Sequence, residues 1–334
     1  VLQEGTFERV GSAWSTVQTF RREGWKFPKR GQAGSGDIAW QELTHAMGNN
    51  EYVARPWHLP EYCHPTYWTT REMCRAIQRR DPRKPGFWYC SYAAPHQPIT
   101  PPREYLDMYR DIGIDDPVIG DWAANPEHWP YALKRHNSRF LPLAPDEIRL
   151  ARMGFYAQCT YIDHQIRLLI GTLREEGLLD NTVILFTGDH GDMLGNHNLW
   201  CKPPMYEWSA KIPMILVPPA DYARSGHHRV DDRLVCLRDV MPTLLDLCGL
   251  GIPPTVEGLS MIGPERRDRL LCEHHEDERA MRMLRTRTHK LIWYPVGNRF
   301  HLFDLVRDPM ELHDRSANPA DAGLLNELKR ALAQ

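Results

Sequence analysis

The chain has 334 residues, of which 42% are hydrophobic and 25% charged, and its formal net charge is −2 at pH 7. This composition is typical of a globular protein, and without a dominant basic cluster it gives no support to nucleic acid as a partner. No apolar run reaches the length of about 18 residues that a membrane span needs. The 8 cysteines form no Cys-x-x-Cys pair, which excludes a zinc ribbon and a regular disulfide framework.

The first part of the chain predicts one helix and one strand. Its beginning is mixed in polarity and includes a glycine-rich loop at 31–36. A helix is expected over 69–79, with Thr69 or Thr70 as its cap. Two prolines then end the helical pattern, and an apolar run predicts a buried strand at 87–92.

The middle of the chain begins irregularly and then becomes strongly helical. Residues 100–145 are rich in proline and aromatic side chains, which predicts at most short helices. Such a segment either borders an active site or is a surface insertion, and both interpretations stay open. The clearest helix is predicted over 145–176, with Pro145 at its first position and Gly177 as its stop. A strand at 183–186 follows, and this helix-to-strand crossover favours parallel pairing.

The second half completes the predicted fold class. We expect an α/β fold in which a mostly parallel central sheet is flanked by helices, followed by a small antiparallel C-terminal subdomain. The boundary between the two is placed after residue 265, which gives domains at 1–265 and 266–334. The elements expected in this half are a strand at 212–217, a helix at 239–248, an antiparallel region at 280–305 and a helix at 321–333.

A cluster of polar residues follows the predicted strand at 183–186. Asp189 and His190 come just past its carboxyl end, where ligands bind in open α/β sheets. They offer one oxygen and one nitrogen to a divalent cation, which wants about six ligands, so other ligands must come from elsewhere. Lys202 has the character of a point charge for an anionic oxygen. The alternative is a loop turn beside a solvated lysine.

The segment from Thr187 to Pro213 resembles the sulfatase family of the alkaline phosphatase superfamily. Relatives carry a Thr-Gly-Asp-His/Asn-Gly turn, a Leu-Trp-x-Lys-x-x-x-Tyr-Glu segment and a Val/Ile-Pro strand. Further segments agree in order with this family. They are a Pro-His-x-Pro loop around His96, a helix with the turn after it at 234–259, and closing strands at 290–294 and from 302–305 through 308–312.

The resemblance implies a fold, a reaction and roles for particular residues. The fold is alkaline-phosphatase-like, and the reaction is hydrolysis of the sulfate ester of an alcohol or phenol. Asp189 and His190 would be metal ligands, with Ca²⁺ as the first expectation and Mn²⁺ or Mg²⁺ as alternatives. Lys202 and His96 would bind sulfate oxygens and assist the leaving group. The substrate is expected to be a small-molecule or carbohydrate sulfate ester, contacted by His197 and His274.

The family's nucleophile motif is not found in the sequence. Relatives carry a Cys-x-Pro/Ala-x-Arg motif whose cysteine is oxidised to formylglycine, and no cysteine here fits it; Cys201 lies within the Leu-Trp-x-Lys segment instead. The paired aspartates of an early strand and a Gly-Lys-x-His motif are not found either. We therefore expect the chain to be the C-terminal two-thirds of a sulfatase, inactive alone, with the formylglycine in the missing region.

Two other functions stay open at this point. A phosphonate monoester hydrolase or phosphodiesterase of the same superfamily could use the same metal, lysine and histidines. A non-catalytic sulfatase-like binding protein could lack the first third altogether. The sequence leaves open whether the protein forms a homo-oligomer, and whether its compartment is cytoplasmic or periplasmic.

Overall fold

The structure is a computed structural model, and it describes residues 52, 54–138, 140, 143–202, 205–222 and 230–333. The glycine-rich loop predicted at 31–36 lies outside the described residues. The described part of the chain divides into two compact units. Unit 1 falls within Val1–Asp116 and Pro142–Asp180, and unit 2 falls within Pro117–Leu141 and Asn181–Gln334. The predicted boundary after residue 265 lies inside unit 2, shortly before its four-stranded sheet.

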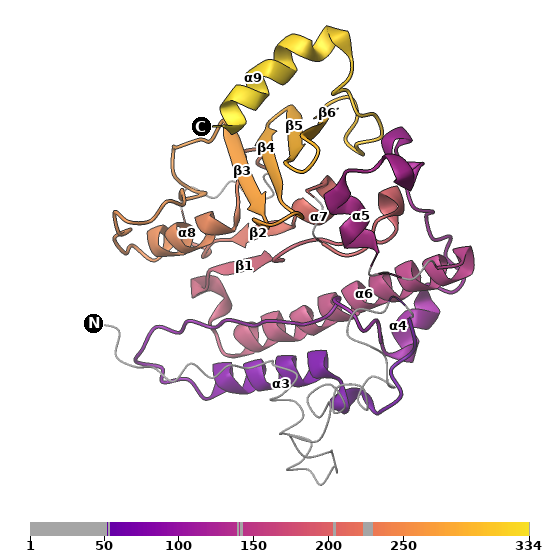
Figure 1. Ribbon diagram of the computed structural model, residues 1–334. Coiled ribbons are helices and arrows are strands. Elements are labelled where there is room, and N and C mark those ends of the chain that lie inside the picture. The colour runs from indigo at the N-terminus through magenta and orange to yellow at the C-terminus, as the bar shows by residue number, and fades with distance from the viewer. Residues whose placement is uncertain are drawn as a thin grey trace. The chain divides into compact units, whose positions relative to one another are not determined.

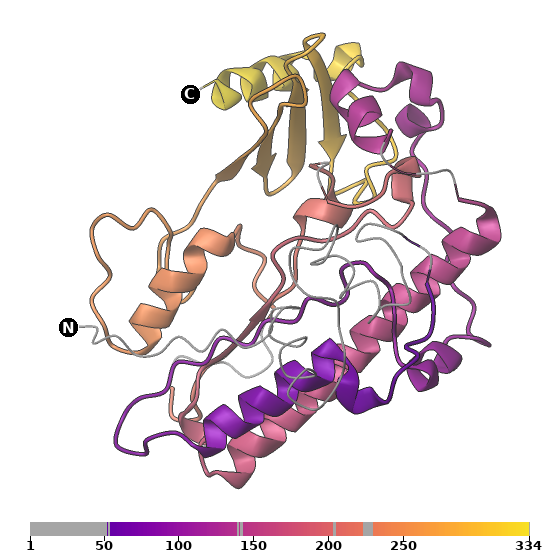
Figure 2. The same cartoon turned by 60° about the horizontal axis from the view of Figure 1, so that its bottom comes forward.

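Unit 1 is built on two helices that lie side by side, α3 (Pro65–Gln78) and α6 (Pro145–Glu175) (Figures 1 and 2). α3 begins earlier than the sequence predicts, because a histidine and not a threonine caps it. The Nδ1 atom of His64 accepts the Thr66 N–H at 3.1 Å. The predicted cap Thr70 lies inside the helix, where its hydroxyl donates to the Thr66 carbonyl oxygen at 3.0 Å.

α6 confirms the helix predicted over 145–176. The Glu147 side chain accepts the Ala144 N–H at 2.7 Å, which satisfies a backbone donor at the helix start. The helix ends before Gly177, whose φ of 66° lies in the left-handed region. Midway along it, a Cβ added at Gly154 would lie 2.6 Å from the Ala54 Cβ. The helix therefore packs closely on the segment around Ala54.

The strand predicted at 87–92 is not formed. These residues form neither helix nor strand, and they pair with no other described segment. Two of their large side chains are exposed, Phe87 at 69% and Tyr89 at 72%. A strand of a sheet needs ladder partners at its edges, and the described residues supply none to this segment. One side of the segment is partly covered, since the Tyr92 hydroxyl lies 3.0 Å from the Thr70 hydroxyl of α3.

Unit 2 contains a two-stranded sheet of β1 (Ile184–Thr187) and β2 (Met214–Val217). Both strands were predicted, but their pairing is antiparallel, with Phe186 opposite Ile215. The expectation of parallel pairing is therefore wrong for this pair. It rested on the crossover from α6 to β1, whereas β2 is reached through a loop that turns back.

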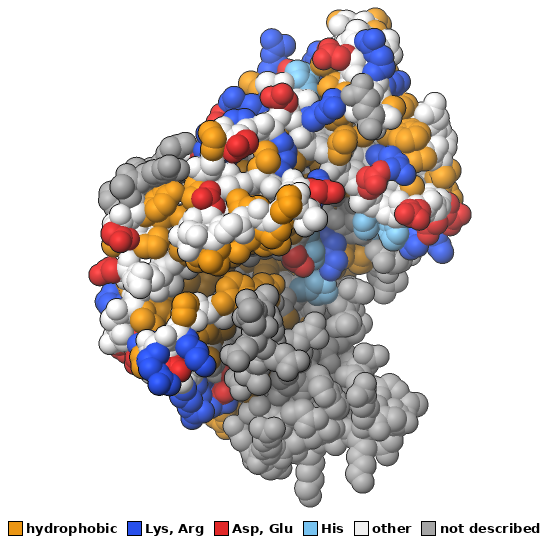
Figure 3. Space-filling view, turned by 90° about the vertical axis from the view of Figure 1, so that its left-hand side faces the viewer, with side chains coloured by type: hydrophobic (Ala, Val, Ile, Leu, Met, Phe, Trp, Pro, Cys, Tyr) orange, Lys and Arg blue, Asp and Glu red, His pale blue; other side chains and the backbone are white. Residues whose placement is uncertain are grey.

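Several apolar side chains of this sheet are exposed. Phe186 is 37% exposed, Ile215 54% and Val217 47%. Because successive side chains of a strand alternate between faces, Ile215 and Val217 share one face of β2, and Phe186 lies beside Ile215. Figure 3 shows hydrophobic side chains gathered on one face of the molecule.

The C-terminal part of unit 2 is the antiparallel region that the sequence predicts. Its four strands follow one another in the order β3-β4-β5-β6. One face packs on a core that includes Tyr206 and Phe303. On the other face, Leu284 and Leu291 pack against Leu328 of the last helix, α9 (Ala322–Leu332) (Figure 1). The strands are β3 (Arg269–His274), β4 (Met281–Thr286), β5 (His289–Tyr294) and β6 (Arg299–Asp304).

The remaining helices are short apart from α9. The prediction of at most short helices in 100–145 is confirmed for its described residues, and so is the helix expected at 239–248. None of the described helices combines the length and apolar character that crossing a bilayer requires. The α-helices are α4 (Arg103–Met108), α5 (Tyr131–Asn137), α7 (Glu207–Ala210), α8 (Val240–Leu247) and α9 (Ala322–Leu332). The 3₁₀ turns are η1 (Glu61–Cys63), η2 (Asp121–Ala123), η3 (Pro126–His128), η4 (Leu179–Asn181), η5 (Asn196–Asn198), η6 (Leu237–Asp239) and η7 (Pro319–Asp321).

Candidate functional site

The loop that follows β1 is held against α7 by a close backbone contact. The Gly191 N–H donates to the Ser209 carbonyl oxygen at 2.8 Å. A Cβ added at Gly191 would lie 2.1 Å from the Trp208 carbonyl oxygen, so only glycine allows this approach. The contact fixes the beginning of the loop relative to α7.

The far end of the same loop has a strained backbone. Four of its non-glycine residues have a positive φ, in the left-handed region. This conformation costs energy in a residue with a side chain, and such residues are often found at functional sites. Backbone hydrogen bonds support it, such as the one from the Met193 N–H to the Cys201 carbonyl oxygen at 3.0 Å. The residues concerned are Leu194 (φ 45°), His197 (φ 55°), Asn198 (φ 58°) and Cys201 (φ 67°).

Asp189 and His190 lie together at the start of this loop. The His190 Nε2 atom is 3.5 Å from the Asp189 Oδ2 atom. The His190 Nδ1 atom lies 2.8 Å from the Gly191 carbonyl oxygen. A proton on Nδ1 is thereby favoured, so Nε2 is the nitrogen that could bind a metal. The Asp189 side chain is 85% exposed, and its Oδ2 atom is close enough to the His190 Nε2 atom for both to bind one cation.

These two residues fit part of a metal-binding shell. A carboxylate oxygen and an imidazole nitrogen this close can bind one divalent cation. Such a cation takes about six ligands, however, and two residues do not supply them. Within the described ranges, no group of three or more His, Cys, Asp or Glu side chains could hold a metal ion.

Lys202 is connected to the same short helix. It is half-buried, and its carbonyl oxygen accepts a hydrogen bond from the Ser209 hydroxyl. Just before it, the Trp200 carbonyl oxygen lies 2.7 Å from the buried His136 Nε2 atom. Since Ser209 contacts both Gly191 and Lys202, the predicted metal ligands and the predicted anion-binding lysine are tied to one helix.

Two further predicted site residues, His96 and His274, lie in different units, and nothing in the structure tests their roles. His96 belongs to unit 1, where its Nδ1 atom lies 2.8 Å from the Gln97 carbonyl oxygen. His274 ends β3 in unit 2, and its ring centroid is 4.1 Å from that of His275. Leaving-group assistance by His96 and substrate contact by His274 stay predictions.

His197 does not fit the predicted contact with substrate. Its side chain is fully buried, at 0% exposure. The Gly120 N–H donates to its Nδ1 atom at 3.0 Å, and its ring packs on Trp122 and Tyr206. Burial lowers its pKa to about 4, so the ring is neutral at physiological pH. We correct this prediction: His197 supports the loop from the interior, because its packing leaves no access for a substrate.

A buried group of charges lies beside α7, and it was not predicted from the sequence. Lys290 of β5 is 2.7 Å from Glu207 and 2.8 Å from Glu311, and both Lys290 and Glu311 are 0% exposed. Arg285 of β4 adds a second cation 3.3 Å from Glu207. We call these four residues the charge cluster. All except Arg285 lie in segments that carry the family resemblance, but the sequence does not reveal that they meet.

The pKa values of the two carboxyl groups in the charge cluster shift in opposite directions. Burial opposes the charge on Glu207, but Lys290 and Arg285 outweigh it, and the pKa of Glu207 is lowered. Burial raises the pKa of Glu311 and is only partly offset by Lys290. The Lys290 Nζ and Glu311 Oε1 atoms lie 2.8 Å apart and form an ion pair.

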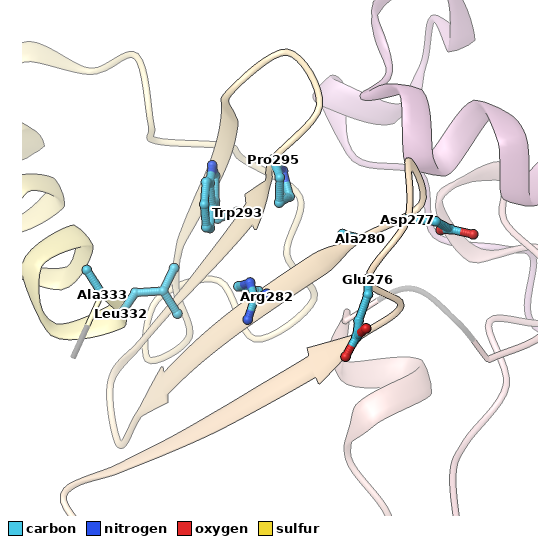
Figure 4. A pocket seen from close by; sticks show the side chains of 8 residues that line it. All are labelled: Glu276, Asp277, Ala280, Arg282, Trp293, Pro295, Leu332 and Ala333. Carbon is cyan, nitrogen blue, oxygen red and sulfur yellow. The ribbon is translucent and has the colours of Figure 1, made fainter.

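A pocket of about 390 Å³ lies elsewhere in unit 2, on the α9 side of the four-stranded sheet (Figure 4). Trp293 and Arg282 form part of its floor, and Leu332 closes it from α9. Arg282 is paired with Glu273. None of the predicted site residues lines this pocket, so we do not assign it to the candidate site.

Fold and site together define a class of protein. An α/β chain with a carboxylate-imidazole pair directly after a strand, and a lysine on the same loop, is typical of the alkaline phosphatase superfamily. The sulfatase family model matches residues 30–250, and the model for the C-terminal part of N-sulphoglucosamine sulphohydrolase matches residues 195–334. The chain therefore belongs to the sulfatase family.

Individual relatives agree with this assignment. The chain is 39% identical over 269 residues to an arylsulfatase of Clostridium perfringens, which is 79% of this chain and 56% of that protein. It is 30% identical over 247 residues to a choline-sulfatase of Rhizobium meliloti, which is 71% of this chain and 47% of that protein. The chain thus spans about half the length of these curated relatives.

A solved structure confirms the predicted fold class. The structure of a phosphonate monoester hydrolase from Agrobacterium radiobacter superposes with a TM-score of 0.75. The superposition covers 96% of this chain and 68% of that chain, at 21% sequence identity. At this identity the similarity concerns the fold alone.

Proposed function

We propose that the whole protein is a metal-dependent sulfatase that hydrolyses the sulfate ester of an alcohol or phenol. The observation that carries the proposal is the connection of Gly191, next to the Asp189-His190 pair, and of Lys202 to the single residue Ser209. This connection supports a cation site and an ammonium group on one loop, as an anionic ester requires. The sulfatase relatives support sulfate as that anion.

The residues of this chain have defined roles in the proposal. Asp189 binds the metal through a carboxylate oxygen, and His190 binds it through the Nε2 atom of its imidazole. Lys202 binds a sulfate oxygen and stabilises the charge that develops in the transition state. His96 donates a proton to the departing alcohol oxygen.

Two components of the proposed site are not supplied by these residues. A divalent metal, when bound, orients the nucleophile and neutralises sulfate oxygens. We propose Ca²⁺ for this place, with Mn²⁺ and Mg²⁺ as alternatives, because the Asp189 carboxylate offers the hard oxygen ligand that these cations prefer. The nucleophile is proposed to be a formylglycine from a part of the whole protein that this chain does not contain.

The substrate class is a small-molecule or carbohydrate sulfate ester. Relatives named as arylsulfatase and choline-sulfatase support the first. The match of residues 195–334 to a model named for N-sulphoglucosamine sulphohydrolase supports the second. A phosphonate monoester is the second candidate, because a cation and a lysine serve a phosphoryl oxygen as well as a sulfuryl one.

The test is a side-by-side assay of the whole protein on matched aryl esters. Initial rates are measured with an aryl sulfate and with an aryl phosphonate that release the same phenol, at equal metal concentration. A higher kcat/KM for the sulfate is expected. A clear preference for the phosphonate would replace the sulfatase proposal with the phosphonate hydrolase, and no turnover of either ester would favour a binding protein.

A further inference from the structure

We propose that the charge cluster is a positioning device for Lys202, and that Glu207 connects the cluster to the lysine. The inference deepens the proposed function and rests on it for the role of Lys202 as an anion-binding group. It concerns residues that lie in the four-stranded sheet, in the segment after β6 and in α7, away from the predicted metal ligands in the sequence.

The first step is the burial of the charges. Lys290 and Glu311 are both 0% exposed. Charged side chains are rarely buried so completely, since leaving water is costly unless each charge finds a partner. Here Lys290 has two carboxylates, Glu207 and Glu311, within 2.8 Å. Three hydrophobic side chains of similar volume in place of Lys290, Glu207 and Glu311 would stabilise the fold at least as well. A purely stabilising role therefore does not explain why these charges are buried together.

The second step is the hold of the charge cluster on α7. The Glu311 Oε2 atom accepts the backbone N–H of Glu207 at 2.7 Å, at the first residue of α7. The Glu207 side chain is held at the same time by Lys290 at 2.7 Å and by Arg285 at 3.3 Å. Backbone and side chain of one residue are thereby fixed to β4, β5 and the segment after β6.

The third step leads from α7 to the candidate site. Ser209 lies two residues after Glu207 in the same helical turn. Its hydroxyl donates to the Lys202 carbonyl oxygen, and its own carbonyl oxygen accepts the Gly191 N–H at 2.8 Å. α7 has only four residues, so a shift at Glu207 is transmitted directly to Ser209. Through it, the sheet sets the spacing between Lys202 and the loop that carries His190.

The experiment compares Glu207→Gln with the unaltered chain by competitive amine labelling. A limiting amount of an acylating reagent is added at constant pH, and mass spectrometry gives the labelling rate of Lys202 relative to Lys134. Glu207→Gln keeps the volume and removes the charge. Because a loosened α7 exposes the Lys202 loop, we expect the relative labelling rate of Lys202 to rise by at least about threefold.

Two further variants separate positioning from general destabilisation. Ser209→Ala leaves the charge cluster intact, removes only the hydroxyl contact to Lys202, and is expected to raise the labelling rate in the same way. Asp239→Asn is the matched control, since Asp239 is also buried and paired, with Arg267 at 2.5 Å, and its side chain bonds to Cys236, Leu259 and Arg267, which lie outside α7. It is expected to lower stability without changing the labelling of Lys202.

The labelling result can be told apart from a failure of the proposed sulfatase function. Labelling reports the place of Lys202 even if the protein hydrolyses no sulfate ester. In an active whole protein, Glu207→Gln is further expected to lower kcat about ten- to a hundredfold with little change in KM, as misplacement of a transition-state group does. The proposal is overturned if Glu207→Gln and Ser209→Ala label like the unaltered chain, or if Asp239→Asn labels as they do.

Discussion

Replacing Lys290 by methionine is the most informative test of the charge cluster's energetics. Methionine keeps the length and apolar stem of the side chain, so little packing is lost. Glu207 retains Arg285 at 3.3 Å, whereas Glu311, at 0% exposure, is left with its charge unpaired. Breaking a buried pair in this way costs about 3–5 kcal/mol, and we expect Lys290→Met to lower the free energy of unfolding by that amount.

The loss should depend on pH in a defined direction. Burial already raises the pKa of Glu311, and Lys290 now partly offsets that rise. Without the lysine, the folded-state pKa of Glu311 rises further above its unfolded value. A group with a raised folded pKa contributes most stability at low pH and loses it as pH rises through that pKa. The deficit of Lys290→Met is therefore expected to be smaller at pH 5 than at pH 8.

The assay is urea unfolding followed by tryptophan fluorescence, with linear extrapolation to water. Lys290→Met, Glu311→Gln and the double variant form a cycle, and the double variant is expected to be more stable than additivity predicts by about 1–3 kcal/mol. Arg307→Met is the control, because the Arg307 side chain is 82% exposed, and it should change stability by less than about 0.5 kcal/mol. A loss below about 1 kcal/mol for Lys290→Met, or an additive cycle, would refute the reasoning.

Three further changes are expected to have measurable effects. Gly191→Ala should destabilise unit 2 by about 1–3 kcal/mol through its clash with α7, whereas Gly323→Ala, in the open face of α9, should not; equal urea midpoints would contradict this. Burial holds the pKa of His197 and His301 at about 4, below the unfolded value. The folded state therefore binds fewer protons, and stability should fall by about 3 kcal/mol per histidine as pH drops from 6.5 to 4, so a flat profile would be contrary evidence. This chain offers two of about six metal ligands and should bind Ca²⁺ weakly in calorimetry, and Asp189→Asn should abolish that binding; submicromolar affinity would contradict the ligand assignment.

Local patterns made much of the fold predictable. α6 was placed to within a residue because a proline at its first position and Gly177 at its end are signals contained in a few neighbouring residues. The strands β1 and β2 were found for the same reason. Their antiparallel pairing was not, because pairing depends on how the connecting loop returns, and periodicity carries no information on that.

The candidate site was predictable where one short segment carries it. Asp189, His190 and Lys202 were predicted from a motif within a single loop and its flanks, and their roles stay predictions. The charge cluster was not, because Glu207 and Glu311 are 104 residues apart. The inward orientation of His197 also escaped prediction, since a polar residue in a loop is expected to be exposed and only tertiary packing decides otherwise.

The most direct test of the central claim is the effect of Lys202→Ala on hydrolysis of an aryl sulfate by the whole protein. If Lys202 stabilises charge on sulfate oxygens, its loss should lower kcat by about 10²–10³, as removal of one transition-state contact does. The release of sulfate and phenol is measured at saturating substrate and metal, with Lys134→Ala as the surface control. Unchanged turnover in Lys202→Ala would contradict the account, because the loop would then not carry the anion-binding group.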